Sequence, residues 1–127
     1  MNRKAFSLVE IILVVAIIAL LSAIAIPNLL RAKVAANESS AQSTLKSIAN
    51  ALETFSISNG RYPVETTSLI GAAPPYLTKD YFVGIYNGYT FTASLTDYTY
   101  IITAAPSSPS FGTNSFTIST GAVLVAN

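Results

Sequence analysis

The first part of the chain is apolar with few interruptions. Residues 6–26 are apolar except for Ser7, Glu10 and Ser22. At about 1.5 Å per residue, a helix of this length spans about 31 Å, close to the ~30 Å hydrocarbon core of a bilayer. The pattern therefore predicts a membrane-spanning helix. It also raises a question about Glu10, because a charged side chain in such a segment is costly and no partner for it is evident nearby.

After Pro27 the pattern changes from uniformly apolar to amphipathic. Asn59-Gly60 is a helix stop signal and Pro63 prevents continuation, so we predict one helix over residues 6–58. We expect a kink at Pro27, at the end of the apolar run, because proline removes a backbone hydrogen bond. Apolar and polar positions fall on opposite faces of this helix. The apolar stripe is Val34, Ala41, Leu45, Ile48, Leu52 and Phe55, and the polar face is Ser40, Ser43, Lys46, Ser47, Asn50 and Glu53.

The remaining residues form short β-rich runs punctuated by turn signals. Asn87-Gly88 lies between two such runs and predicts a tight hairpin. Further strands are expected at residues 98–104 and on both sides of Thr120-Gly121, with an exposed loop at 106–115. The total is about four or five antiparallel strands, and residues 60–80 connect the helix to them with one helical turn.

These elements predict an α+β fold with one long N-terminal α-helix. The apolar half of the helix protrudes from the globular part. The amphipathic half, residues 34–55, packs on the small antiparallel β-sheet, because one face of such a sheet must be covered and no other amphipathic helix is predicted.

Composition narrows the function. The chain of 127 residues has 7 Lys and Arg against 6 Asp and Glu, and it contains no Cys and no His. Its near-neutral charge argues against nucleic-acid binding. The lack of His and Cys removes most zinc sites and the usual nucleophile–base pairs. We therefore expect no enzyme activity, no cofactor and no metal site. A cleaved secretory signal is disfavoured, because Glu10 interrupts the apolar core that such a signal requires.

Two further patterns have ordinary explanations. Tyrosines gather in the predicted strands, which fits strand propensity and cross-strand packing better than a ligand or electron-transfer surface. Asn37-Glu38-Ser39 is a formal N-glycosylation triplet, but it lies in the middle of the predicted helix. Neither pattern changes the expected fold or function.

Type IV pilins and their type II secretion relatives, the pseudopilins, begin with a sequence that this chain resembles: RKAFSLVEIILVVAIIALLSAIAIPNLL. The resemblance rests on the basic Arg3-Lys4 ahead of Phe6, on Glu10 and on Pro27. The helix end, ALETFSISNGRYP, and the layout of leader, long helix and small antiparallel sheet are similar as well.

The resemblance implies chemistry that is done to this protein. A prepilin peptidase would cut between Ala5 and Phe6 and methylate the new amine of Phe6, so that residues 1–5 are a leader peptide. Residues 6–28 would form the transmembrane and filament-core helix, and residues 29–127 the globular domain. Glu10 would pair with the N-terminal amine of a neighbouring subunit, and the two charges would offset each other's desolvation.

The implied function is that of a structural subunit, which polymerises through its N-terminal helix into a type IV pilus. Its partners would be further copies of the chain, the prepilin peptidase and an inner-membrane assembly platform. It would lie in the bacterial inner membrane before assembly and in an extracellular or periplasmic filament afterwards. The alternatives are a major pseudopilin of a type II secretion system and a membrane-anchored monomeric binding protein.

Three features depart from the family pattern. Ala5 stands where the residue before the cut is usually Gly; it is the nearest residue in size, so we expect cleavage here. The chain has no cysteine for the C-terminal disulfide of many pilins. Residues 104–119 contain no carboxylate, whereas major pseudopilins bind calcium in this region. The last difference favours a pilin over a pseudopilin.

Overall fold

A computed structural model describes residues 4–127, so Arg3 of the predicted leader lies outside the described residues. The chain divides into two compact units, of which the first ends at Lys33 and the second is Val34–Asn127. One helix, α1 (Leu8–Asn59), contributes residues to both units. The prediction of a single long helix is confirmed, although Phe6 and Ser7 precede its first residue.

The part of α1 that belongs to the first unit has no apolar core. Its described side chains are exposed up to Lys33, except for the half-buried Ser22. Pro27 lies inside the helix, and the kink expected there stays a prediction. Residues 6–28 as the transmembrane segment and residues 29–127 as the globular domain also stay predictions.

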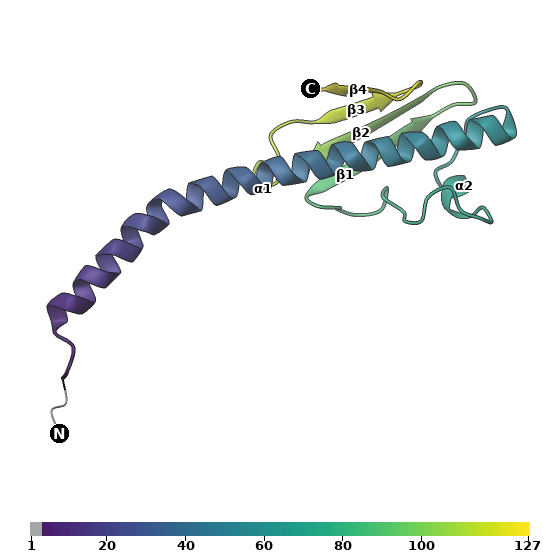
Figure 1. The fold of residues 1–127 in the computed structure, drawn as a ribbon. Helices are drawn as coiled ribbons and strands as arrows, with labels where there is room; N and C mark the ends of the chain where they lie inside the picture. The colour runs from purple at the N-terminus through teal and green to yellow at the C-terminus, as the bar shows by residue number, and fades with distance from the viewer. Residues whose placement is uncertain (1–3) are drawn as a thin grey trace. The chain divides into compact units, whose positions relative to one another are not determined.

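In the second unit α1 buries the side of the helix that carries the predicted apolar stripe. Figure 1 shows this part of α1 running along one face of the sheet. Leu45, Ile48 and Leu52 are completely buried, as a helical spacing of three and four residues requires. The buried helix residues are Ala41, Thr44, Leu45, Ile48, Ala49, Ala51 and Leu52.

Among the described residues, one sheet of 4 antiparallel strands follows the helix in the simple order β1-β2-β3-β4. Tyr100, Ile102 and Ala104 of the second strand are buried, while Ile101 between them is exposed, so alternate side chains point toward α1. The predicted α+β arrangement is confirmed. The strands are β1 (Tyr89–Leu95), β2 (Tyr100–Pro106), β3 (Phe116–Ser119) and β4 (Val123–Ala126).

The hairpin predicted at Asn87-Gly88 is reduced to a single bridge. Asn87 and Gly88 have φ values of 48° and 81°, as a tight turn requires. Tyr86 and Tyr89 exchange backbone hydrogen bonds of 2.8 and 3.0 Å. Between α1 and Tyr86 the structure has no strand, so that part of the prediction was wrong. Side-chain packing holds the segment instead, with the rings of Tyr81 and Tyr86 5.1 Å apart.

The other turn predictions are confirmed. The turn at Thr120-Gly121 joins β3 to β4, and Gly121 has a φ of 81° there. The connection between α1 and β1 contains the expected helical turn, α2 (Thr67–Ile70). The carbonyl of the buried Leu69 accepts hydrogen bonds from the N–H groups of Tyr76 and Leu77, at 2.9 and 3.0 Å. These bonds hold the loop after α2 in place.

Candidate functional site

Ala5 and Phe6 lie just before α1, in a stretch that is not helical. Both side chains are exposed, and 82% of the Phe6 side-chain surface is accessible. The bond between them therefore lies in an exposed, non-helical segment, where peptidases most readily cut. Cleavage at this bond stays a prediction.

Glu10 has a partner within its own segment. The backbone N–H of Ser7 donates to Glu10 Oε2 at 2.7 Å, and the Ser7 hydroxyl accepts from the Glu10 N–H at 3.2 Å. This reciprocal pair is a capping box, in which a Ser and a Glu three residues later satisfy two free donors at a helix start. The expectation that no partner lies nearby was wrong. The sequence signal, Ser7-Leu8-Val9-Glu10, was available and was read only as part of an apolar run.

The cap itself supplies no positive charge to Glu10, although Lys4 lines the same small hollow. It satisfies one carboxylate oxygen with a neutral N–H donor, and both residues are exposed. After Glu10 no charged residue occurs until Arg31. Apolar side chains cover the helix between them on all sides, and α1 is long and apolar enough there to cross a membrane. An exposed apolar surface of this size is typical of segments that lie in lipid or against another protein chain.

A second carboxylate, Glu38, fastens the loop between β2 and β3 to α1. Glu38 Oε1 accepts hydrogen bonds from the N–H and hydroxyl of Thr113, at 2.9 and 3.0 Å, and from the Asn114 N–H at 3.2 Å. Donors that favour the charged form hold the pKa of Glu38 below its ordinary value, with the Thr113 N–H as the main cause. Asn37 adds a bond to the Phe111 carbonyl at 2.9 Å. The formal glycosylation triplet is thus engaged with this loop.

A third carboxylate, Glu53, fastens the other end of the sheet. It accepts hydrogen bonds from the hydroxyls of Tyr62 and Tyr100, at 3.0 Å each, and from the Gly121 N–H at 3.2 Å. Burial, and then the nearby carboxylate, raise the pKa of Tyr62 above its ordinary value. Burial also raises the pKa of Tyr100 strongly, and Glu53 adds to this effect. The sequence interpretation placed Glu53 on the polar face opposite the apolar stripe, whereas the structure leaves it half-buried beside the sheet.

The tyrosines of the strands are packing residues. Tyr89 and Tyr100 are fully buried, and the Tyr100 ring meets Tyr62 edge-on with centroids 5.1 Å apart. Tyr98 is exposed. Among residues 4–127 no three His, Cys, Asp or Glu side chains come together as a metal site would require.

Comparison with known proteins places these features in a family. The model of the prokaryotic N-terminal methylation motif matches residues 1–26. The chain is 32% identical over 117 residues to the type IV wide pilus major component PilA4 of Thermus thermophilus, and the match covers 89% of both proteins. It is 38% identical over 73 residues to the type IV major pilin protein PilA of Myxococcus xanthus, 58% of this chain and 33% of that protein.

A secretion protein is similar over a shorter stretch. The chain is 31% identical over 68 residues to the type II secretion system core protein G of Aeromonas hydrophila. This match covers 54% of the chain and 48% of that protein. The similarity to the Thermus protein therefore extends over much more of the sequence.

Proposed function

Because this chain belongs to the type IV pilin family, we propose that it is a structural subunit, which polymerises through the N-terminal half of α1 into a type IV pilus. The observation that carries the proposal is the exposed apolar surface of α1 between Glu10 and Arg31. Burial of apolar surface is the main force in protein association. A lipid bilayer can hold this surface before assembly, and the same surface on other copies can hold it afterwards.

Glu10 gives this association its specificity. After cleavage between Ala5 and Phe6, Phe6 carries a new amine, which the prepilin peptidase then methylates. The amine of one subunit pairs with the Glu10 carboxylate of a neighbour. A bare apolar helix can slide along its neighbours, whereas a single ion pair in an apolar bundle fixes their axial register. The capping box keeps Glu10 satisfied until that pair forms.

The chain acts as a substrate and a building block, with no reaction of its own. We place it in the bacterial inner membrane before assembly and in an extracellular filament afterwards. The assembly platform of the inner membrane takes up the mature form, and further copies of the chain are its main partners. The structural proteins named as its relatives support this assignment.

A major pseudopilin of a type II secretion system is the second candidate. The similarity to core protein G supports it, but that similarity covers 54% of the chain, against 89% for the pilus component. A pseudopilin would form a periplasmic filament that serves secretion. We favour the pilus because the longer match includes most of the sheet-forming residues.

The test is to shear surface material from the producing cells, image it by negative-stain microscopy and measure the intact mass of its main protein. We expect filaments whose subunit lacks residues 1–5 and carries one added methyl group on Phe6. An unprocessed N-terminus in assembled filaments would contradict the proposed maturation. Absence of surface filaments, together with a secretion defect in cells that lack the gene, would establish the pseudopilin instead.

A further inference from the structure

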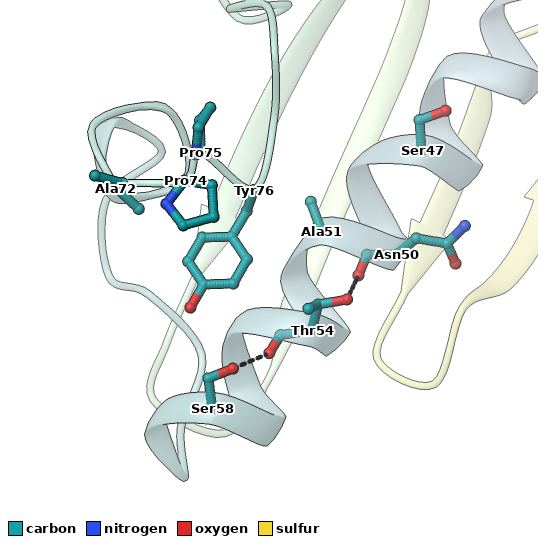
Figure 2. A pocket seen from close by; sticks show the side chains of 10 residues that line it. Ser47, Asn50, Ala51, Thr54, Ser58, Ala72, Pro74, Pro75 and Tyr76 are labelled. Atoms are coloured by element: carbon teal, nitrogen blue, oxygen red, sulfur yellow. Dashed lines mark hydrogen bonds between the residues drawn. The ribbon is translucent and has the colours of Figure 1, made fainter.

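A groove of about 690 Å³ lies beside α1 in the second unit. One wall consists of α1 residues that include Ser47, Thr54 and Ser58, and the other is the loop after α2, with Pro74 and Tyr76 (Figure 2). Its volume falls within the range of roughly 300–1,000 Å³ that is typical of small-ligand pockets. Neither the capping box nor the carboxylate contacts of Glu38 and Glu53 involve this groove.

The residues that line the groove include no charged side chain. An anionic ligand would find no Lys or Arg there, and a cationic ligand no Asp or Glu. Enclosing an ion without a countercharge is costly. The groove therefore selects a neutral ligand.

The hydrogen-bonding groups of the walls narrow the ligand further. The hydroxyls of Ser47, Thr54 and Ser58 donate to the carbonyls four residues earlier in α1, at 3.1, 2.7 and 3.1 Å. Their oxygens can still accept a hydrogen bond, but each hydroxyl proton is already used. Pro74 and Pro75 have no N–H to offer. The Asn50 amide and the Tyr76 hydroxyl also line the groove and can donate hydrogen bonds. The groove thus favours a ligand whose groups both donate and accept hydrogen bonds, as sugar hydroxyls do.

Tyr76 contributes an aromatic face on the loop side of the groove. Its ring packs edge-on against Phe55 with centroids 5.3 Å apart, and its N–H is bonded to Leu69. Both contacts hold the ring in place before any ligand arrives. Figure 2 shows the ring and Pro74 across from Thr54. Aromatic and proline faces suit the C–H face of a pyranose ring, whose hydroxyl edge brings the donors that the helix side accepts.

We propose that this groove binds a neutral oligosaccharide. The groove residues of α1, such as Thr54 and Ser58, lie about one helical turn apart. One turn rises about 5.4 Å, which is comparable to the length of one sugar ring. Two or three successive rings can therefore lie along the helix with their hydroxyls facing it. The residues that line this site all belong to the second unit.

The test uses the full chain in a zwitterionic detergent without a sugar headgroup, and saturation-transfer NMR as the readout. The probes are maltotriose, cellotriose and tri-N-acetylchitotriose, with trigalacturonate as the anionic comparison. We expect at least one neutral trisaccharide to receive saturation and trigalacturonate to receive none. Binding of trigalacturonate alone, or of no neutral trisaccharide at millimolar concentration, would overturn the proposal.

Thr54→Trp fills the groove with an indole, and Thr92→Trp makes the same change at an exposed position of β1 outside it. We expect Thr54→Trp to abolish saturation transfer and Thr92→Trp to retain it, with unchanged circular dichroism for both. Tyr76→Phe keeps the ring and should retain binding. Equal binding by Thr54→Trp would show that the saccharide binds elsewhere and would overturn the proposal. Loss of filaments in that variant, when no neutral saccharide binds the unmodified chain, would place the groove between copies instead.

Discussion

The two units of the chain meet the same requirement, burial of apolar surface, in opposite ways. Val34–Asn127 buries its own apolar side chains between α1 and the sheet, and Leu45 is completely inaccessible there. The unit that ends at Lys33 buries none of its described apolar side chains, and Leu8 is 76% exposed. One unit is complete as a single chain, whereas the other must be completed by lipid or by other copies.

The carboxylates of α1 follow the same division. Glu38 and Glu53 each accept hydrogen bonds from loops distant in the sequence, and so tie the sheet to the helix. Among the described residues the hydrogen bonds of Glu10 run to Ser7, three residues away. These bonds cap the helix, but they supply no positive charge. The difference agrees with the proposal that Glu10 pairs with a neighbouring subunit, which remains to be tested.

Removal of residues 1–28 should have the largest effect. We expect residues 29–127 to remain folded and to sediment as a soluble monomer, because the second unit covers one face of its sheet with its own helix. The full chain should need detergent or lipid to stay dispersed. Obligate oligomers of the fragment, or unfolding without a cooperative transition, would break the contrast between the two units.

Leu45→Ala and Leu21→Ala make the same change in the two units. We expect Leu45→Ala to lower the free energy of unfolding by about 2–5 kcal/mol, because it leaves a cavity in a closed core. Leu21→Ala should leave that free energy unchanged. All 7 tyrosines belong to the second unit, so tyrosine fluorescence during denaturant unfolding reports on that unit alone. If both variants lost the same free energy of unfolding, the contrast between a unit with a closed core and a unit without one would be contradicted.

Glu53→Gln should have the next largest effect. It keeps the shape of the side chain but weakens charge-assisted bonds from Tyr62 and Tyr100, so we expect a loss of about 1–3 kcal/mol. Glu65→Gln, at an exposed position, is the control and should change the free energy by less than about 0.5 kcal/mol. Denaturant unfolding measures both. Identical stabilities would mean that Glu53 contributes shape alone.

The raised pKa values of Tyr62 and Tyr100 add a pH dependence at the alkaline end. A tyrosine with a raised pKa in the folded state stabilises the fold fully below its unfolded pKa of about 10, and loses this contribution as the pH rises above it. Burial also raises the pKa of Tyr89, so absorbance of tyrosinate should show three tyrosines that ionise late. In Glu53→Gln we expect Tyr62 to ionise at lower pH than in the unmodified chain.

Acid should release the loop that Glu38 holds, and this effect is small. The pKa of Glu38 is lowered in the folded state, so its contribution is complete above the unfolded pKa and is lost as the pH falls through the folded value. We expect the protection factors of the Thr113 and Asn114 amides, which compare their exchange with that of an unfolded chain at the same pH, to fall at low pH while the sheet stays protected. In Glu38→Gln the exchange at these two amides should no longer depend on this titration.

The sequence pattern predicts the fold well where the physics is local or periodic. The 3.6-residue period located the buried side of α1, and turn residues located the bend at Thr120-Gly121. The sequence pattern failed just before Tyr86, where the segment is held by side-chain packing and not by the backbone hydrogen bonds of a strand pair. Glu53 was misplaced because the helical period alone assigns it to the polar side. Its partners, Tyr62, Tyr100 and Gly121, are brought to it only by folding.

The candidate sites, too, were only partly predicted from the sequence. A charge inside an apolar run is visible in the sequence, so Glu10 was found at once. The capping box was missed, although Ser and Glu three residues apart are its ordinary signal. The groove beside α1 could not be predicted, because its second wall comes from a loop whose path depends on the bonds of Tyr76 and Leu77 to Leu69.

The capping box sharpens the test of Glu10, because charge and cap can be removed separately. Glu10→Gln keeps an acceptor for the Ser7 N–H and removes the charge. Ser7→Ala keeps the charge and removes the hydroxyl of the cap, at a cost of about 0.5–2 kcal/mol to the helix start. Both variants should insert in the membrane and lose residues 1–5, since neither change makes the segment more polar.

The most direct measurement is the number of filaments per cell for these two variants, with mature protein in the membrane quantified by blotting. Removing one partner of a buried ion pair costs ~3–5 kcal/mol, and this recurs at every subunit contact. We predict that Glu10→Gln makes few or no filaments from a normal amount of mature protein, whereas Ser7→Ala still makes them. Normal filaments with Glu10→Gln, and their loss with Ser7→Ala, would reduce Glu10 to a helix cap and contradict its pairing with a neighbouring subunit.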